Sequence, residues 1–317
     1  MKLQTVCLIG GSGFLGRHVA HLLAEQAVRT RIPTRHRERA KQDLIVLPTA
    51  DVIEADVNDP AELARVVGGC DAVVSLAGIL HEQHRGDFAR VHVNLPRKIV
   101  DACREAGVRR LVHVSALQAS HDAPSEYLRS KAGGEQQVRV AEASGIRSTI
   151  FRPSVMFGRE DSFLNLFAKL VRLLPVVALA CPKARFQPVF VEDVAQAVVA
   201  SLNLPDAFDR TYELCGPKVY TLQELVEYVC RLAGVKRMIL PLNDRLSYLQ
   251  ARAMEWLPMK LMTRDNYHSM QIDNVCGCAF PGLFGIQPTA LEAVAPAYLG
   301  GRVPRARLHK LRVRAGR

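Results

Sequence analysis

Three side chains in the first half of the chain could together move a proton to or from a carbonyl oxygen. Tyr127 and Lys131 are four residues apart, which places them on one face of a helix, and Ser115 precedes Tyr127 by twelve residues. A phenol titrates at about pH 10, and we expect the Lys131 ammonium to lower that pKa by favouring the phenolate. Tyr127 could then act as the general acid or base while Ser115 hydrogen-bonds the same oxygen.

A glycine-rich turn near the N-terminus predicts where a phosphate group would bind. Gly10, Gly13 and Gly16 follow an apolar run at residues 5–9 and open a helical pattern at residues 14–26. Gly10 allows a tight turn, Gly13 lets a pyrophosphate approach the backbone, and Gly16 lets the helix pack on the sheet. The free N–H groups at the helix start would bind the phosphate charge. This order predicts a dinucleotide site, and the alternative is a turn with a purely structural role.

The end of the second expected strand indicates which dinucleotide is bound. A carboxylate at this place would hold the ribose 2′-hydroxyl of NAD, but the chain reads Pro-Thr-Arg-His-Arg at residues 33–37. Arg35 could bind a 2′-phosphate through its planar fork of donors, whereas an acid would repel it. The sequence therefore favours NADP(H) over NAD(H). Residues 35–41 could alternatively be the solvated start of a helix without a ligand.

Six strand patterns occur in the first half of the chain, with helical patterns between most of them. Short apolar runs predict strands at 5–9, 30–34, 52–55, 72–76, 110–114 and 148–151. Helical spacing predicts helices at 14–26, 60–67, 94–106 and 126–143, with Asp59 as an N-cap before Pro60. This alternation predicts an α/β fold, a Rossmann-type doubly wound parallel sheet with helices on both faces. Ser115 then lies at the carboxyl edge of the fifth strand, where ligands bind in such sheets.

The regular alternation ends after Pro153. We expect residues 1–155, completed by about 187–205, to form the nucleotide-binding part, and residues 156–186 and 206–300 to form a smaller, mostly helical substrate cap. The apolar stretch 170–181 is either a buried cap helix or the lining of a pocket for a quinone-like substrate. Residues 301–317 are expected to be a basic, disordered tail.

The positive charge of the chain lies in two segments. The 317 residues include 42 Lys and Arg against 31 Asp and Glu, a formal charge of +11. Residues 29–41 contain six basic residues and one acid, and residues 302–317 contain seven basic residues and no acid. A nucleic-acid-binding body would show basic residues across a face, so no nucleic-acid partner is expected. The tail either contacts anionic lipid as a peripheral anchor or only adds solubility.

The eight cysteines indicate the compartment. Most lie in apolar runs, which favours buried free thiols, and their scattered positions argue against a disulfide framework. Cys276 and Cys278 are too close in sequence for a zinc-binding pair. No stretch is long and apolar enough for a signal peptide or a bilayer span. We therefore expect a cytoplasmic protein, at most peripheral at the inner membrane.

Two further clusters have simple structural interpretations. His81, His84 and His92 are not spaced as metal ligands on one element, so a loop is the preferred interpretation and no metal is expected. Glu192 and Asp193 precede a helix expected near Val194, which favours an N-cap over paired catalytic acids.

Several motifs together resemble a known enzyme superfamily, the extended or atypical short-chain dehydrogenases/reductases. The matching features are the glycine turn, Asp56-Val57, Leu76-Ala77-Gly78, Ser115, Tyr127 with Lys131, and Arg152-Pro153. Val189 to Ala195 and Tyr212 to Gly216 resemble the epimerase/dehydratase branch of that superfamily. Residues 127–132 and 157–165 are similar, more narrowly, to the NADPH-binding accessory subunit family of respiratory complex I.

The resemblance implies a role for each matching residue. Ser12, Gly13, Phe14 and Leu15 would contact the pyrophosphate, and Arg35 the 2′-phosphate. Asp56 and Val57 would line the adenine site. The nicotinamide half would be lined by Leu76, Ala77, Gly78, Lys131 and Pro153. Catalysis would fall to Ser115, Tyr127 and Lys131.

Three functions remain open at the level of sequence. The first is an NADP(H)-dependent oxidoreductase that acts on an apolar carbonyl or quinone-related small molecule. The second is a nucleotide-bound assembly or stability factor for respiratory complex I or ubiquinone metabolism, without turnover, which the resemblance to the complex I subunit implies. The third is an NADP(H) redox sensor that signals to a respiratory-chain or other protein. Tyr127 is required only by the first.

Overall fold

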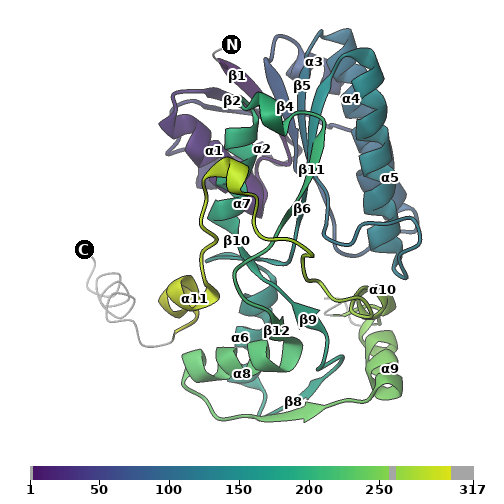
Figure 1. The fold of residues 1–317 in the computed structure, drawn as a ribbon, viewed down its shortest axis with the longest axis vertical. Helices are drawn as coiled ribbons and strands as arrows, with labels where there is room; N and C mark the ends of the chain where they lie inside the picture. Colours follow the sequence, from purple (N-terminus) through teal and green to yellow (C-terminus); the bar gives the residue numbers. More distant parts are fainter. Residues whose placement is uncertain (1–2, 257–261, 301–317) are drawn as a thin grey trace.

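The computed structural model describes residues 3–256 and 262–300, so the basic tail expected at 301–317 lies outside the described residues. Its main sheet contains seven parallel strands in the order β11-β6-β5-β4-β1-β2-β3 (Figure 1). The strands are β1 (Thr5–Ile9), β2 (Arg29–Thr34), β3 (Ala50–Glu54), β4 (Ala72–Ser75), β5 (Arg110–Val114), β6 (Arg147–Pro153) and β11 (Arg210–Leu214). The predicted doubly wound parallel sheet is confirmed.

Helices cover both faces of this sheet. One face packs against α1 (Phe14–Glu25), α2 (Arg37–Leu44) and α7 (Val191–Ser201). The other packs against α3 (Pro60–Val67), α4 (Leu95–Glu105) and α5 (Glu126–Val140). A π-helical turn, η1 (Ala89–Asn94), leads into α4, and a 3-10 turn, η2 (Ala141–Ser144), follows α5.

The first strand shows why the sheet needs two helical layers. Val6 and Leu8 point into the core on one face, and Cys7 and Ile9 into the core on the other. All four side chains are completely buried. A strand that is apolar on both sides is stable only between two covering layers, as in parallel sheets generally.

The chain reverses direction across the sheet between β1 and β4. These neighbours are paired from Val6–Ala72 to Ile9–Ser75, although two other strands separate them in sequence. Ligands bind at such a switch point, outside the carboxyl ends of the strands. The same edge receives the ends of β5 and β6, because all these strands run in one direction.

Local signals placed the start of α3 correctly. The Asp59 carboxylate accepts hydrogen bonds from the N–H groups of Ala61 (2.8 Å) and Glu62 (3.2 Å), as expected of an N-cap before Pro60. The Ser125 hydroxyl caps α5 in the same way, accepting from the N–H of Leu128 at 3.2 Å. This second cap fixes the start of the helix that carries Tyr127 and Lys131.

A second group of short elements builds a cap with a core of its own, around Leu164, Val171, Leu225 and Val229. In Figure 1 the group lies at the end of the molecule opposite the N-terminus. Its elements and those linking it to the main sheet are β7 (Met156–Phe157), α6 (Phe163–Leu173), β8 (Val176–Leu179), β9 (Arg185–Phe186), β10 (Val189–Phe190), η3 (Pro205–Ala207), β12 (Tyr220–Thr221), α8 (Leu222–Ala233), β13 (Met238–Pro241), α9 (Asp244–Met254), α10 (Arg264–Ser269), η4 (Gly282–Phe284) and α11 (Leu291–Leu299).

Two sequence-based expectations for this second half are wrong. Residues 210–214 were expected in the cap, but β11 pairs with β6 and forms the edge of the main sheet. Residues 170–181 are not one buried helix, because α6 ends at Leu173 and Pro175 precedes the strand β8. Proline cannot continue the helix, and the β-branched residues Val176 and Val177 favour a strand.

The expected cap by Glu192 and Asp193 is also wrong. The helix α7 already begins at Val191, and no side chain caps it. Asp193 is buried, and its carboxylate accepts from the N–H (2.7 Å) and the hydroxyl (3.0 Å) of Thr289 instead. This long-range pair ties the C-terminal segment to the nucleotide-binding part.

One close contact in α5 generates a stability prediction. A Cβ on Gly134 would overlap the backbone carbonyl oxygen of His92, whereas one on Gly133 would meet only the Val93 side chain, 3.0 Å away. We expect Gly134→Ala to lower the free energy of unfolding by about 1–3 kcal/mol through overpacking. Gly133→Ala is the matched control, because it makes the same gain in helix propensity without a backbone clash. Urea unfolding of both variants measures the difference, and equal midpoints would contradict the close packing.

Candidate functional site

The glycine turn after β1 is shaped by close backbone contacts. Gly10 has a φ of +84°, and a Cβ there would lie 2.9 Å from the Ala77 nitrogen. A Cβ on Gly16 would lie 2.5 Å from the carbonyl oxygen of Gly10. Both distances are too short for a side chain, so the turn needs glycine at these two positions. The two glycines let the start of α1 and the end of β4 lie close together at the switch point.

The start of α1 is open for an anion. Gly13 is its N-cap residue, no side chain caps the helix, and its first turn contains no acidic residue. The first N–H groups of a helix have no partner inside it and carry a partial positive charge. Gly13 is exposed, and Ser12 and Phe14 are half-buried beside it, while Leu15 is buried. The residues present fit the pyrophosphate of a dinucleotide.

Arg35 and Asp56 follow neighbouring strands at the same edge. β2 and β3 are paired through Thr34 and Glu54, so the residues that come next lie side by side. Arg35 is exposed and makes no hydrogen bond within the described part of the chain. Asp56 accepts from the backbone and side-chain N–H groups of Asn58 (3.0 and 2.8 Å), which lower its pKa. The half-buried Val57 follows it.

Other basic residues around Arg35 have structural partners. Arg31 donates to the carbonyl of Gly68 at 2.5 Å, Arg37 to that of Val52 at 3.1 Å, and Lys41 pairs with Glu38 at 3.3 Å. These contacts hold α2 and α3 against the sheet. Within the basic segment 29–41, Arg35 is therefore a cation that remains available to a ligand at the carboxyl edge of the sheet.

Lys131 and Ser115 meet at the carboxyl end of β5. The buried ammonium of Lys131 donates to the carbonyl oxygen of Val114 at 2.8 Å, and Ser115 is the next residue. The Ser115 hydroxyl is buried and has no hydrogen-bond partner among the described residues. Burial lowers the Lys131 pKa to about 8, and Glu135 partly offsets that effect. A buried hydroxyl and an ammonium are thus held together at the edge where ligands bind.

Tyr127 lies one helical turn before Lys131, but the pKa of the Tyr127 phenol differs from the expectation. Burial raises it to about 12, with a further contribution from the Asp265 carboxylate. The expectation that Lys131 lowers this pKa is therefore wrong. Lys131 is directed to the Val114 carbonyl, whereas the carboxylate of Asp265 lies at the start of the helix and disfavours the phenolate.

His92 connects this helix to the opposite wall of the site. Its Nε2 accepts from the N–H of Ile79 (3.0 Å), its Nδ1 lies 2.8 Å from the Ser130 hydroxyl, and that hydroxyl donates to the Tyr127 carbonyl (2.7 Å). The acceptor role of Nε2 places the proton on Nδ1. Burial, and then the Lys131 charge, lower the His92 pKa to about 3, so the ring stays neutral.

Sequence reasoning missed the contributions of His92 and Asp265. Asp265, at the start of α10, accepts from the N–H groups of Glu126 (2.6 Å) and Tyr127 (3.1 Å). It lies 138 residues beyond Tyr127, so no local pattern links the two. His92 lies in the π-helical turn η1, an irregularity that frequently marks functional sites but has no clear sequence signal.

The residues expected along the nicotinamide half line the same edge. Gly78 is exposed, and a Cβ added there would lie 3.7 Å from His92 Nε2 and 3.8 Å from Lys131 Nζ. Leu76 and Ala77 are half-buried and lead into it from β4. Pro153 is the last residue of β6, and its carbonyl accepts from the N–H of Leu117 at 3.0 Å. The structure thus brings the predicted residues to one edge of the sheet.

A cavity of about 620 Å³ lies between the start of α5 and the cap helices α9 and α10, and Tyr127 itself is not among its lining residues. It is lined by His81, Glu82, Phe88, Pro124, Glu126, Arg129, Tyr248, Glu255, Thr263, Arg264, Asp265 and His268. Phe88 contacts the Tyr127 ring, with 6.0 Å between centroids, and so links the cavity to the phenol. The lining is largely charged or polar. Residues 170–181, considered for an apolar pocket, do not belong to the described lining.

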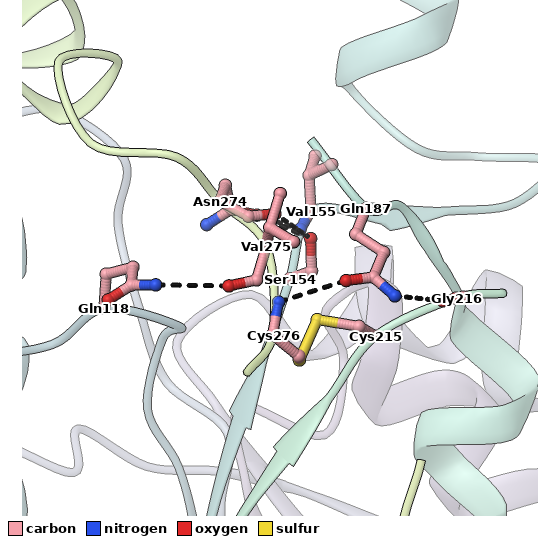
Figure 2. Close-up of a disulfide and its surroundings, with 9 residues drawn as sticks. All are labelled: Gln118, Ser154, Val155, Gln187, Cys215, Gly216, Asn274, Val275 and Cys276. Carbon is pink, nitrogen blue, oxygen red and sulfur yellow. Dashed lines mark hydrogen bonds between the residues drawn. A yellow bond between two sulfur atoms is a disulfide. The ribbon is translucent and has the colours of Figure 1, made fainter. Parts of the chain in front are cut away.

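A disulfide lies close to the ends of β6 and β11. Cys215 follows β11 and is bonded to Cys276 (Figure 2). Their Cα atoms are 6.1 Å apart. The expectation of free thiols is therefore wrong for these two residues. They are 61 residues apart, and spacing alone could not indicate the pair. Cys278 is free and exposed, and Cys7 and Cys103 are free and buried as expected.

The segment around Cys276 is held at several points besides the disulfide. The Asn274 side chain accepts from the Ser154 hydroxyl (2.5 Å) and the Val155 N–H (3.1 Å). The Val275 carbonyl accepts from the Gln118 side chain at 3.2 Å (Figure 2). Ser154 directly follows Pro153. The C-terminal segment therefore runs directly beside Pro153, one of the residues predicted to line the nicotinamide half of the cofactor site.

Comparison with known proteins is consistent with this geometry. Residues 6–215 match the model of the NAD dependent epimerase/dehydratase family. The chain is 35% identical over 293 residues to NADH dehydrogenase [ubiquinone] 1 alpha subcomplex subunit 9, mitochondrial, of Rattus norvegicus, covering 90% of this chain and 77% of the relative. It is 30% identical over 242 residues to a ceramide reductase of Caulobacter vibrioides, covering 75% and 74%.

A solved structure shares the fold across nearly the whole chain. The NADPH-dependent quinone oxidoreductase of Escherichia coli, solved with NADPH, superposes with a TM-score of 0.72 and 19% sequence identity. The match covers 93% of this chain and 99% of that one. At this identity the likeness shows the fold alone.

The disulfide predicts a stability that depends on reductant. Closing a loop of this length stabilises a folded chain by about 4 kcal/mol in the chain-entropy model. We expect dithiothreitol, or Cys276→Ser, to lower the melting temperature measured by differential scanning fluorimetry. Cys278→Ser is the matched control and should keep the full response to reductant. Free thiols at both Cys215 and Cys276 in peptide mapping of the unreduced protein would contradict the bond.

Proposed function

The chain belongs to the NAD-dependent epimerase/dehydratase family, and we propose that it works as an NADPH-dependent reductase of a carbonyl compound. The observation that carries this proposal is the position of Lys131. Its ammonium is buried against the Val114 carbonyl, next to the unpartnered Ser115 hydroxyl, at the carboxyl edge of β5. A buried charge is costly to maintain, and a catalytic role beside a substrate oxygen would account for it.

The protonation state of Tyr127 favours the reductive direction. With a pKa raised to about 12, the phenol keeps its proton throughout the neutral range and can donate it. When bound, NADPH supplies the hydride that reaches the carbonyl carbon. Tyr127 then gives its proton to the carbonyl oxygen, to which Ser115 donates a hydrogen bond. Because burial raises the pKa of Tyr127, the phenolate that forms readily takes up a proton again in the neutral range.

The cavity beside Tyr127 supports a substrate with polar groups. Glu126, Arg129 and Asp265 bring charges of both signs to its lining, and a purely apolar compound would remove water from these charges without offering them a hydrogen bond. This favours a polar carbonyl substrate over the apolar compound expected from the sequence. Phe88 adds one aromatic surface that could pack against the substrate.

The subunit relative favours a second candidate function. The Rattus norvegicus protein is named as a subunit of NADH dehydrogenase, and similarity to it extends over 90% of this chain. The chain could accordingly bind nucleotide as an assembly or stability factor for a respiratory-chain protein, without turnover. Both functions use the glycine turn and Lys131, and only the reductase needs the Tyr127 hydroxyl.

The substitution Tyr127→Phe separates the two functions. We expect it to reduce the rate of NADPH oxidation by about 100-fold or more, since it removes the proton donor, while NADPH affinity stays unchanged. The assay follows NADPH absorbance with a panel of aldehydes, ketones and quinones.

The control variant is Tyr212→Phe, which removes a hydroxyl bound to the Asp206 carbonyl at 3.2 Å, away from the cavity. It should retain wild-type turnover. Turnover that persists in Tyr127→Phe would exclude this residue as the acid. Tight NADPH binding without oxidation by any of the panel would favour the stability factor.

Arg35 generates a separate prediction about the cofactor. We expect Arg35→Ala to weaken NADPH binding about tenfold or more and to leave NADH binding unchanged, because a charge-assisted bond to the 2′-phosphate contributes about 1.5–3 kcal/mol. Isothermal titration calorimetry measures both affinities. Arg39→Ala, an exposed cation on the neighbouring helix, is the control. Preference of the wild-type protein for NADH would refute the assignment of Arg35.

A further inference from the structure

The outer end of the cap exposes apolar side chains that the described part of the chain does not cover. We call this surface the cap apolar face and define it by Val176, Met238, Leu240, Leu246, Leu249 and Trp256. Trp256 is 87% exposed, Met238 66% and Leu249 57%. Large apolar side chains gathered in one place on a surface mark a site of interaction.

The strands β8 and β13 provide half of this face. They pair in parallel, with Val176 opposite Met238 and Ala178 opposite Leu240. Side chains alternate along a strand, so these four point to one side of the two-stranded sheet. The side chains of Val177 and Leu179 point the other way, into the cap core. The outward side of this small sheet is apolar and has no covering layer in the described chain.

The helix α9 provides the other half. It buries small residues and exposes large apolar ones, the reverse of the usual amphipathic pattern. Its buried residues are the small Ser247 and Ala251. Leu246 and Leu249 are three residues apart on the opposite side of the helix, and the exposed Trp256 follows two residues after the helix ends at Met254. A helix that only completed a fold would bury its large apolar residues and expose its small polar ones.

Hydrogen bonds join the two halves into one surface. The Gln250 side chain donates to the Ala178 carbonyl at 2.9 Å, and the Leu242 N–H donates to the Leu179 carbonyl at 3.0 Å. In Figure 1, β8 and α9 lie together at the end of the molecule opposite the N-terminus. The apolar stripe of α9 therefore continues the apolar side of the β8–β13 sheet.

The charges around the face are predominantly positive. Arg245, Arg252 and Lys236 are exposed beside it. The acidic residues nearby have partners: Asp244 accepts from the Tyr267 hydroxyl at 2.7 Å, and Glu255 pairs with Arg264 at 2.9 Å. An apolar surface edged with cations complements a layer that is apolar inside and anionic outside.

We propose that the cap apolar face docks on the surface of an anionic lipid bilayer. Leucine, methionine and valine would enter below the headgroups, Trp256 would lie at the headgroup level, and the arginines would meet lipid phosphates. A protein partner would need about one hydrogen bond per 100–200 Å² of interface, and apart from the Trp256 indole the defining side chains offer none. The chain needs no spanning segment for this, and none of its described helices is long and apolar enough to cross a membrane.

Trp256 provides a direct test, because it is the only tryptophan of the chain. We expect its fluorescence to shift to shorter wavelength when the full-length protein is mixed with vesicles of equimolar phosphatidylcholine and phosphatidylglycerol. Brominated lipids should quench it, and the protein should sediment with the vesicles. Vesicles of phosphatidylcholine alone should bind at least fivefold more weakly, since each basic residue near an anionic surface contributes about that factor.

Two variants and a control identify the surface. Leu249→Asp should weaken partitioning about tenfold or more, because it inserts a charge among the apolar side chains. The double variant Arg245→Gln and Arg252→Gln should abolish most of the preference for anionic vesicles. Val46→Asp is the matched control, since Val46 is 76% exposed just after α2, outside the cap, and it should bind as wild type.

Three results would overturn the proposal. The first is no sedimentation and no spectral shift with either vesicle. The second is sedimentation that survives Leu249→Asp without a change in Trp256 emission, which would assign binding to the basic residues at 302–317. The third is a stable oligomer in sedimentation velocity that already shows shifted emission and that Leu249→Asp dissociates, which would assign the face to a second copy of the chain.

Discussion

The buried ammonium of Lys131 is the interaction around which the candidate site is built. A charge in the interior is tolerated only where dipoles and hydrogen bonds replace water, and here the Val114 carbonyl does so. The nearest carboxylate on the same helix face, Glu135, is engaged by Arg152 through two bonds of 2.7 Å. The ammonium therefore stays only partly compensated, which explains its lowered pKa and leaves it available to a ligand.

The position of the Lys131 ammonium depends on close packing of α5 against the turn η1 that carries His92. Gly134 allows the helix to touch the backbone of His92, and Ser130 then reaches the His92 ring. At the start of the same helix, Asp265 and Ser125 bind the first N–H groups. Each contact restricts the position of α5 along its axis, and together they set where the phenol and ammonium lie relative to Ser115.

The sequence predicted the parts of this arrangement that depend on neighbours in the chain. The glycine turn, the Asp59 cap and the strands β1 and β5 follow from local sterics and periodicity, so these predictions were confirmed by the fold. The contacts of Asp193 with Thr289, of Cys215 with Cys276 and of Asp265 with Tyr127 join residues 61 to 138 positions apart. No spacing rule reaches so far, and one of these contacts, with Asp265, adds to burial in raising the pKa of Tyr127.

The helix α9 shows how the C-terminal half serves two surfaces at once. One side buries Ser247 and Ala251 in the cap, and a second brings Tyr248 to the cavity, which Glu255 at the C-cap also lines. A third side carries Leu246 and Leu249 to the outside, and the exposed Trp256 follows the helix. Because its buried residues are small, the helix can lie close to the cap without using its large apolar side chains for that purpose. Whatever covers the outer side must therefore contact the element that forms one wall of the cavity.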